Sequence, residues 1–201
     1  MSLPILLKNW LSTLPTKASP ASTDRILWYD QAGNASKAQT KAQLDAQLGY
    51  RLACLLTTTA VQSVSATTAT AVLFNTETFD VGGLHSTSVN TSRITIPAGG
   101  DGLWLFAHTV TFTAAYIEQG SDRQSYIRRN GASAERHAAV RITMPPYTSA
   151  LPSLTGATIV RAVATDYFEV VVFSERDINL PAAPGGVPNW QTSFSATRLG
   201  D

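Results

Sequence analysis

From Ala71 onwards, apolar and polar residues alternate with a period of two, and short runs of turn-forming residues interrupt the alternation. This pattern predicts short antiparallel strands, because successive side chains of a strand point to opposite faces of a sheet. Strands are expected at residues 71–80, 92–97, 102–114, 123–129, 134–143, 156–164, 167–174 and 191–199. Short strands separated by frequent turns predict a mainly β chain folded as an antiparallel β-sandwich or jelly roll.

Turn signals lie between the expected strands. Asn130-Gly131 is a strong type I′ hairpin signal, because both residues accept the positive φ that this turn requires. Residues 97–102, Pro-Ala-Gly-Gly-Asp-Gly, separate two strands, and residues 164–166 predict a tight corner. Apolar residues dominate in 103–112, which indicates a central strand of the sandwich.

Most aromatic residues fall within these strands, where a core or subunit-interface role is the default. This group comprises Phe74, Phe79, Trp104, Phe106, Phe112, Phe168, Phe173 and Phe194. Three other aromatics lie in or near expected loops and are candidate contact residues, because an amphipathic ring in a loop suits a binding edge. They are Tyr116, Tyr147 and Trp190. The long loop 178–189 is either functional or an ordinary connection.

The first 56 residues have a different pattern. Apolar spacing over residues 3–14 predicts a helix that carries Leu7 and Trp10. Residues 24–30, with Trp28 and Tyr29 among them, predict a short strand.

A second helix is expected over residues 35–56, with Leu44 and Leu48 on one face. The Thr/Ser/Ala-rich stretch 57–70 is interpreted as a linker, although its β-branched residues also permit an extended strand. The predicted organisation is therefore a small mixed α/β segment at 1–56, a linker at 57–70 and a sandwich at 71–201.

Five motifs occur in the order that one family of jelly rolls has them. They are the opening strand 72–80, the Pro-x-x-Gly corner and aromatic strand within 93–106, Ile-Arg-Arg-Asn-Gly at 127–131, the Asp corner at 165–170, and Ser-Phe-Ser-Ala at the start of the closing strand 193–200. With these motifs, residues 71–200 resemble the C1q/TNF-like jelly roll. Trp104 stands where that family usually has Tyr, and Thr165 and Ala196 stand where it has Gly. The resemblance implies a homotrimer that binds and does not catalyse.

The first segment carries a second resemblance. Residues 24–30 followed by residues 36–44 are similar to a segment of bacteriophage fibre and minor structural proteins. This implies a virion protein, assembled in the host cytoplasm, of tail-fibre, head-fibre or decoration type. Residues 1–56 would bind other virion proteins, with Leu7, Trp10, Trp28, Tyr29, Leu44 and Leu48 as anchors, and the head would meet a host-surface glycan or protein. The alternative is a free C1q/TNF-like ligand or lectin that binds a receptor or glycan.

Several chemistries find no support in the residues. The three histidines lack metal-ligand spacing, and the one cysteine, Cys54, excludes a zinc pattern and an intrachain disulfide. No nucleophile elbow, phosphate loop or Asp-rich calcium loop occurs, so no catalytic residue, cofactor or metal is expected. A net charge of +1 gives no electrostatic case for nucleic acid, and no apolar run approaches the ~20 residues of a membrane span. His108 is expected to be a structural histidine.

Overall fold

The computed structural model describes residues 25–30, 35–40, 52–113, 121–145, 151–182 and 192–200. The chain divides into two compact units, residues 1–50 and 51–201. In the first unit, β1 (Arg25–Asp30) pairs antiparallel with β2 (Ala35–Thr40). The strand expected at 24–30 is therefore present, whereas the helix expected from residue 35 is replaced at its start by a strand.

The local sequence explains this difference. Ser and Thr are mediocre helix formers, and pairing with the Trp-Tyr strand β1 gives residues 35–40 a hydrogen-bonded partner that a helix start would lack. The expected helix at 3–14, with Leu7 and Trp10, lies outside the described residues. So do Leu44 and Leu48 of the second expected helix.

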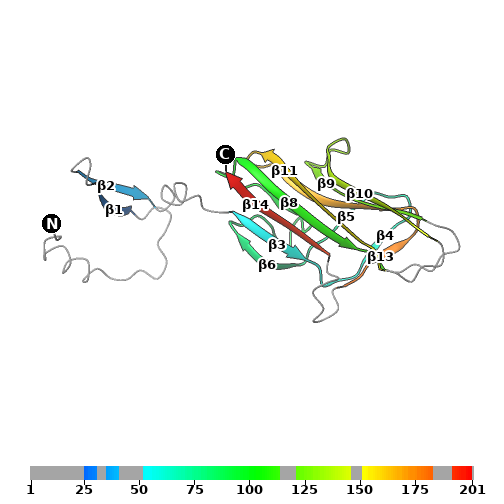
Figure 1. Ribbon diagram of the computed structural model, residues 1–201. Helices are drawn as coiled ribbons and strands as arrows, with labels where there is room; N and C mark the ends of the chain where they lie inside the picture. Colours follow the sequence, from blue (N-terminus) through cyan, green and yellow to red (C-terminus); the bar gives the residue numbers. More distant parts are fainter. Residues whose placement is uncertain are drawn as a thin grey trace. The chain divides into compact units, whose positions relative to one another are not determined.

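Two antiparallel sheets form the second unit (Figure 1). The first, here called the β8 sheet, has the strand order β11-β8-β14-β3-β6. Its strands are β3 (Ala53–Thr57), β6 (Thr76–Val81), β8 (Gly102–Thr111), β11 (Ser153–Ala162) and β14 (Ser193–Gly200).

The second, here called the β9 sheet, has the order β10-β9-β12-β5, and β7 also pairs with β12. Its strands are β5 (Thr70–Ala71), β7 (Arg93–Thr95), β9 (Ser121–Arg129), β10 (Arg136–Met144) and β12 (Tyr167–Ser174). A short pair, β4 (Gln62–Val64) with β13 (Ile178–Leu180), accompanies them. The predicted antiparallel sandwich is confirmed.

The core lies between the sheets and is built on aromatic rings. Phe106 of β8 is fully buried, with its ring centroid 4.1 Å from that of Phe168 and 6.1 Å from those of Trp104 and Phe194. Phe74 and Phe112 are also fully buried. These six are the expected core aromatics that the structure buries.

Two expected core aromatics lie outside the core. Phe173 is half-buried, because its neighbours Val172 and Ser174 take the inward positions of β12. Phe79 is 45% exposed, since it pairs with Leu55 on the outer face of the β8 sheet. The period of two places both residues correctly on strands but does not say which face of each strand is covered.

The sandwich begins earlier in the chain than the sequence pattern suggested. β3 lies between β14 and β6, and its Cys54 and Leu56 are fully buried in the core. Residues 53–56, expected at the end of a helix, are therefore part of the sandwich. The expected linker 57–70 contributes β4 and the start of β5, which is the extended alternative left open by its β-branched residues.

The expected turns at 130–131 and 164–166 are present. Asn130 and Gly131 have φ of 51° and 72°, and the Ala132 amide donates to the Arg129 carbonyl at 2.9 Å, as in a type I′ turn. Thr165 has φ of 74°, an unusual conformation for a β-branched residue.

Candidate self-association face

The outer face of the β8 sheet has three consecutive cross-strand rows without a charged side chain, defined by strand register. Arg161 of β11, which is exposed, stands in the next row of the same face, opposite Leu103. The first row is Ile159, Leu105, Thr197, Ala53 and Val81; the second is Ala157, Ala107, Ser195, Leu55 and Phe79; the third is Thr155, Thr109, Ser193, Thr57 and Thr76. None of these side chains is charged.

Large apolar side chains lie at both edges and in the middle of this face. Ile159, on the edge strand β11, is 60% exposed, and Leu105, on β8, is 37% exposed. Phe79 and Val81, on the opposite edge strand β6, are 45% and 37% exposed. Between them stand small residues such as Ala107 and Ser195, so the surface is flat enough for another protein surface to approach closely. Exposed apolar side chains that gather on one face are typical of a surface that contacts another protein.

The buried titratable groups of the sandwich have structural roles. His108 Nε2 lies 2.9 Å from Ser125 Oγ, and burial lowers the pKa of this histidine to about 4, so it is neutral at pH 7. Burial raises the pKa of the Cys54 thiol to about 12, with Asp80 adding to the effect. A thiol of this kind is inert as a nucleophile.

Two buried carboxylates are held by hydrogen bonds. Burial by itself raises the pKa of Glu169, but hydrogen bonds from Arg128, Ser92 and Arg93 outweigh burial and lower it. Asp166 likewise has a lowered pKa: burial opposes the change, while hydrogen bonds from the Val163 amide and from Asn130 and Arg129 produce it. The network at Asp166 fixes the corner between β11 and β12.

Within the described ranges, no group of three or more His, Cys, Asp or Glu side chains could hold a metal ion. The same part of the chain contains no helix with the length and hydropathy to cross a membrane.

The candidate contact residues Tyr116, Tyr147 and Trp190 lie outside the described residues. Trp28 and Tyr29 lie on β1, opposite Lys37 and Ser36. Sequence reasoning missed the outer face of the β8 sheet as a unit. One signal was present: apolar residues fill both alternating sets of positions in 103–107, which is typical of a strand covered on both sides.

The chain was compared with family models, with curated proteins and with solved structures. No family model matches the sequence, and no curated protein matches it. The sandwich is similar to the crystal structure of murine APRIL at pH 8.0, with a TM-score of 0.51 and 18% identity over 74% of this chain and 99% of that one. The murine APRIL structure at pH 8.5 gives a TM-score of 0.50 with the same identity and coverage. The globular domain of zebrafish complement 1qA gives 0.46 at 12% identity, over 74% of this chain and 97% of that one.

The chain therefore has the two-sheet C1q/TNF-like jelly-roll fold.

Proposed function

We propose that this chain is a structural protein of a bacteriophage-type virion, of fibre or decoration type, whose sandwich forms a homotrimeric head. The observation that carries the proposal is the group of three uncharged rows, with their exposed apolar side chains, on the outer face of the β8 sheet. Contact with another copy would bury its exposed apolar side chains, at about 25 cal/mol for each Å² of apolar surface removed from water. Monomeric soluble domains rarely leave a large contiguous patch of this kind exposed.

The distribution of apolar residues favours a closed ring over a two-fold dimer. Ile159 and Phe79 occupy opposite edge strands of the same sheet, so one subunit can meet two neighbours through different parts of one face. Such head-to-tail contacts close into a ring when the rotation permits it. Proteins with this fold typically form trimers, which supports a ring of three copies.

The virion role rests on the first segment. Residues 24–30 and 36–44 carry the fibre-like pattern, and residues 1–50 form a unit separate from the sandwich. Residues 1–50 and their anchor side chains bind another particle protein in this proposal, and the trimer presents its head outward. Three linked copies strengthen weak contacts with a host-surface glycan or protein, because binding of the second and third sites becomes intramolecular.

The assembly face is tested by a matched pair of charge insertions. Ala107→Glu places a carboxylate in the middle row of the β8-sheet face, whereas Ala139→Glu places one at an exposed position of β10. We expect sedimentation velocity to show monomers for Ala107→Glu and trimers for Ala139→Glu, with native circular dichroism for both. Trimeric Ala107→Glu would show that this face is not the interface.

The particle role is tested by supplying residues 51–201 and the full chain to phage assembly in separate experiments, because mixed trimers would otherwise carry the short chain into particles. The cut at residue 51 keeps β3 in the sandwich. We expect the full chain, and not residues 51–201, in purified particles. Absence of both from particles would favour the alternative of a free ligand or lectin.

A further inference from the structure

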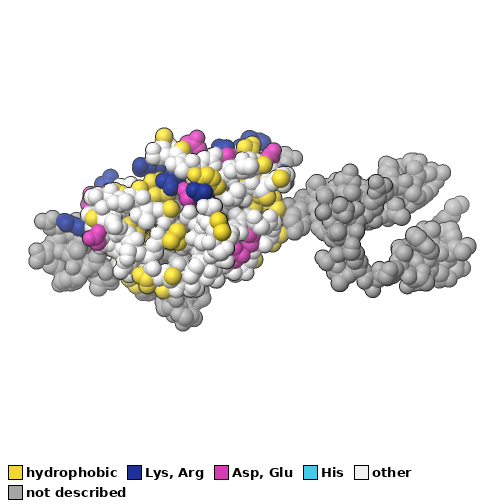
Figure 2. Space-filling view, turned by 180° about the vertical axis from the view of Figure 1, so that it is seen from behind, with side chains coloured by type: hydrophobic (Ala, Val, Ile, Leu, Met, Phe, Trp, Pro, Cys, Tyr) yellow, Lys and Arg dark blue, Asp and Glu magenta, His cyan; other side chains and the backbone are white. Residues whose placement is uncertain are grey.

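One cross-strand row on the outer face of the β9 sheet is rich in arginine. Arg136 of β10 lies opposite Arg128 of β9, Arg128 lies opposite Glu169 of β12, and Glu169 lies opposite Arg93 of β7. Glu169 accepts hydrogen bonds from Arg128 Nη2 at 2.8 Å and Arg93 Nε at 3.2 Å. One carboxylate thus pairs with two guanidinium groups, and the row has an excess of positive charge. Figure 2 shows the side of the molecule opposite to the view of Figure 1, where arginine side chains lie beside hydrophobic and some acidic ones.

Arg136 is held in place although it is exposed. Its guanidinium carbon lies 4.6 Å from the centroid of the Tyr126 ring, and its Nε donates to the Ser133 carbonyl at 3.2 Å. Among the described residues it forms no ion pair with a carboxylate. The two Nη groups therefore remain as a pre-oriented pair of donors, a geometry that matches the two oxygens of a carboxylate or phosphate.

A shallow hollow of about 200 Å³ adjoins this guanidinium. It is lined by Ala69, Gln124, Tyr126, Arg136 and Phe173. Phe173 and Gln124 are half-buried, so a ring face and an amide remain within reach of a ligand. The hollow is smaller than the cavities of about 300–1,000 Å³ that enclose drug-sized molecules.

An arginine, an aromatic ring and an amide lie side by side at this hollow, and together they limit the class of ligand that it suits. A sugar ring has an apolar face that packs on an aromatic ring and polar edges that bond an amide, and an acidic sugar adds an oxyanion for a fixed arginine. An extended peptide would instead use a long groove or an exposed sheet edge, and this hollow lies on the face of β9 and β12. Residues 51–201 contain arginine but no lysine, and arginine is the side chain suited to paired oxyanion bonds and to stacking on rings.

We infer that the hollow beside Arg136 and Phe173 binds an acidic glycan, with the sugar's oxyanion on Arg136 and its ring against Phe173. The inference rests on the proposed function, because it gives the ligand class of the proposed head. The shared chemistry is an oxyanion on a sugar, and its source is either a carboxylate or a phosphate.

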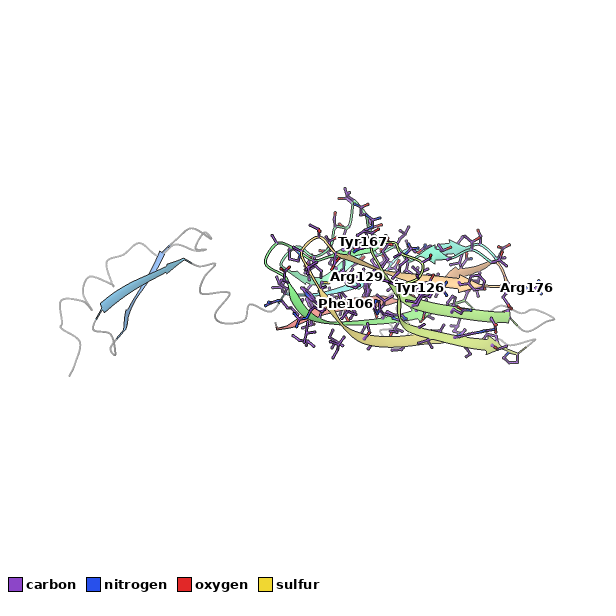
Figure 3. All side chains as sticks on the ribbon, turned by 90° about the horizontal axis from the view of Figure 1, so that it is seen from above. Phe106, Tyr126, Arg129, Tyr167 and Arg176 are labelled. Atoms are coloured by element: carbon purple, nitrogen blue, oxygen red, sulfur yellow. The ribbon has the colours of Figure 1, made fainter. Side chains whose placement is uncertain are left out.

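The experiment measures binding of short sugars to the full chain by isothermal titration calorimetry. The probes are trigalacturonate for the carboxylate, glucose 6-phosphate for the phosphate, and maltotriose as the neutral control. Arg136→Gln and Arg136→Lys are compared with Arg176→Gln, which removes the same charge from an exposed position. Figure 3 shows Arg176 near the end of the sandwich, away from Tyr126. Short probes report single-site affinity, so the result does not depend on whether the chain forms a trimer or joins a particle.

We expect at least one acidic probe to bind more tightly than maltotriose, and the tighter acidic probe identifies the oxyanion source. Arg136→Gln should weaken that binding about tenfold or more, the size of one charge-assisted contact, and Arg136→Lys should weaken it as well because it lacks the paired donors. Arg176→Gln should leave it unchanged. Equal losses in Arg136→Gln and Arg176→Gln would reveal unspecific charge attraction and overturn the inference. Equal affinity for the acidic and the neutral sugars would overturn the inference as well.

Discussion

Phe106→Ala is the substitution whose cost follows most directly from the structure. Phe106 is fully buried at the centre of the aromatic core, with rings at 4.1 Å and 6.1 Å on different sides. Removing the ring exposes a cavity that Phe168, Trp104 and Phe194 cannot collapse into, because each is fixed by its own strand. We therefore expect the loss in unfolding free energy that is usual for this change, about 3–5 kcal/mol.

For a chain of this size, each kcal/mol corresponds to about 2–4 °C, so the melting temperature should fall by about 6–20 °C. The assay is thermal unfolding followed by circular dichroism at one fixed protein concentration, because assembly makes the melting temperature depend on concentration. Val89→Ala is the control, since Val89 is 65% exposed and its truncation should change stability by less than about 0.5 kcal/mol. A fall of less than about 2 °C for Phe106→Ala would refute the central position of this ring in the core.

Three further outcomes are expected. Burial lowers the pKa of His108 from 6.5 to about 4, so as the pH falls the imidazole is protonated in the unfolded chain before it is protonated in the folded one. The free energy of unfolding should therefore fall by up to about 3 kcal/mol between pH 6.5 and pH 4. Urea titrations should show a smaller fall over this pH range for His108→Gln. Cys54, buried with a raised pKa, should react with a thiol reagent only after unfolding, and reaction in the native state at pH 8 would contradict its placement. Thr165→Gly should raise stability by about 0.5–1 kcal/mol in denaturant titrations, because Thr165 has φ of 74° and glycine adopts that conformation without strain; a lower denaturation midpoint would contradict this reasoning.

The sequence predicted the strands that alternate clearly and have strong turn signals. The strand at 167–174 was predicted with the bounds that β12 has, and the type I′ turn at 130–131 followed from two residues that accept positive φ. Local chemistry decides these features, so a single sequence is sufficient to predict them.

Features decided by distant parts of the chain were missed. In the sequence, Leu55 of β3 continues the helical spacing of the leucines at 44, 48 and 52. Only pairing with β14 and β6 makes residues 53–57 a strand. β4 and β13 have three residues each and are held by one another across more than one hundred residues. Such short segments have no periodicity of their own to detect.

The candidate surfaces were missed for the same reason. The rows through Ala107 and through Arg136 are assembled from strands that are far apart in the sequence, so neither row appears as a local motif. The aromatics chosen from loops, Tyr116, Tyr147 and Trp190, lie outside the described residues and remain predictions.

The mass of the native full-length chain in solution tests the central claim most directly. Light scattering coupled to size-exclusion chromatography at micromolar concentration should give three times the chain mass of 21.5 kDa, because the three uncharged rows of the β8 sheet are covered by neighbouring copies. A mass of 21.5 kDa under the same conditions would contradict the account, since those rows would then be exposed to water in a stable monomer.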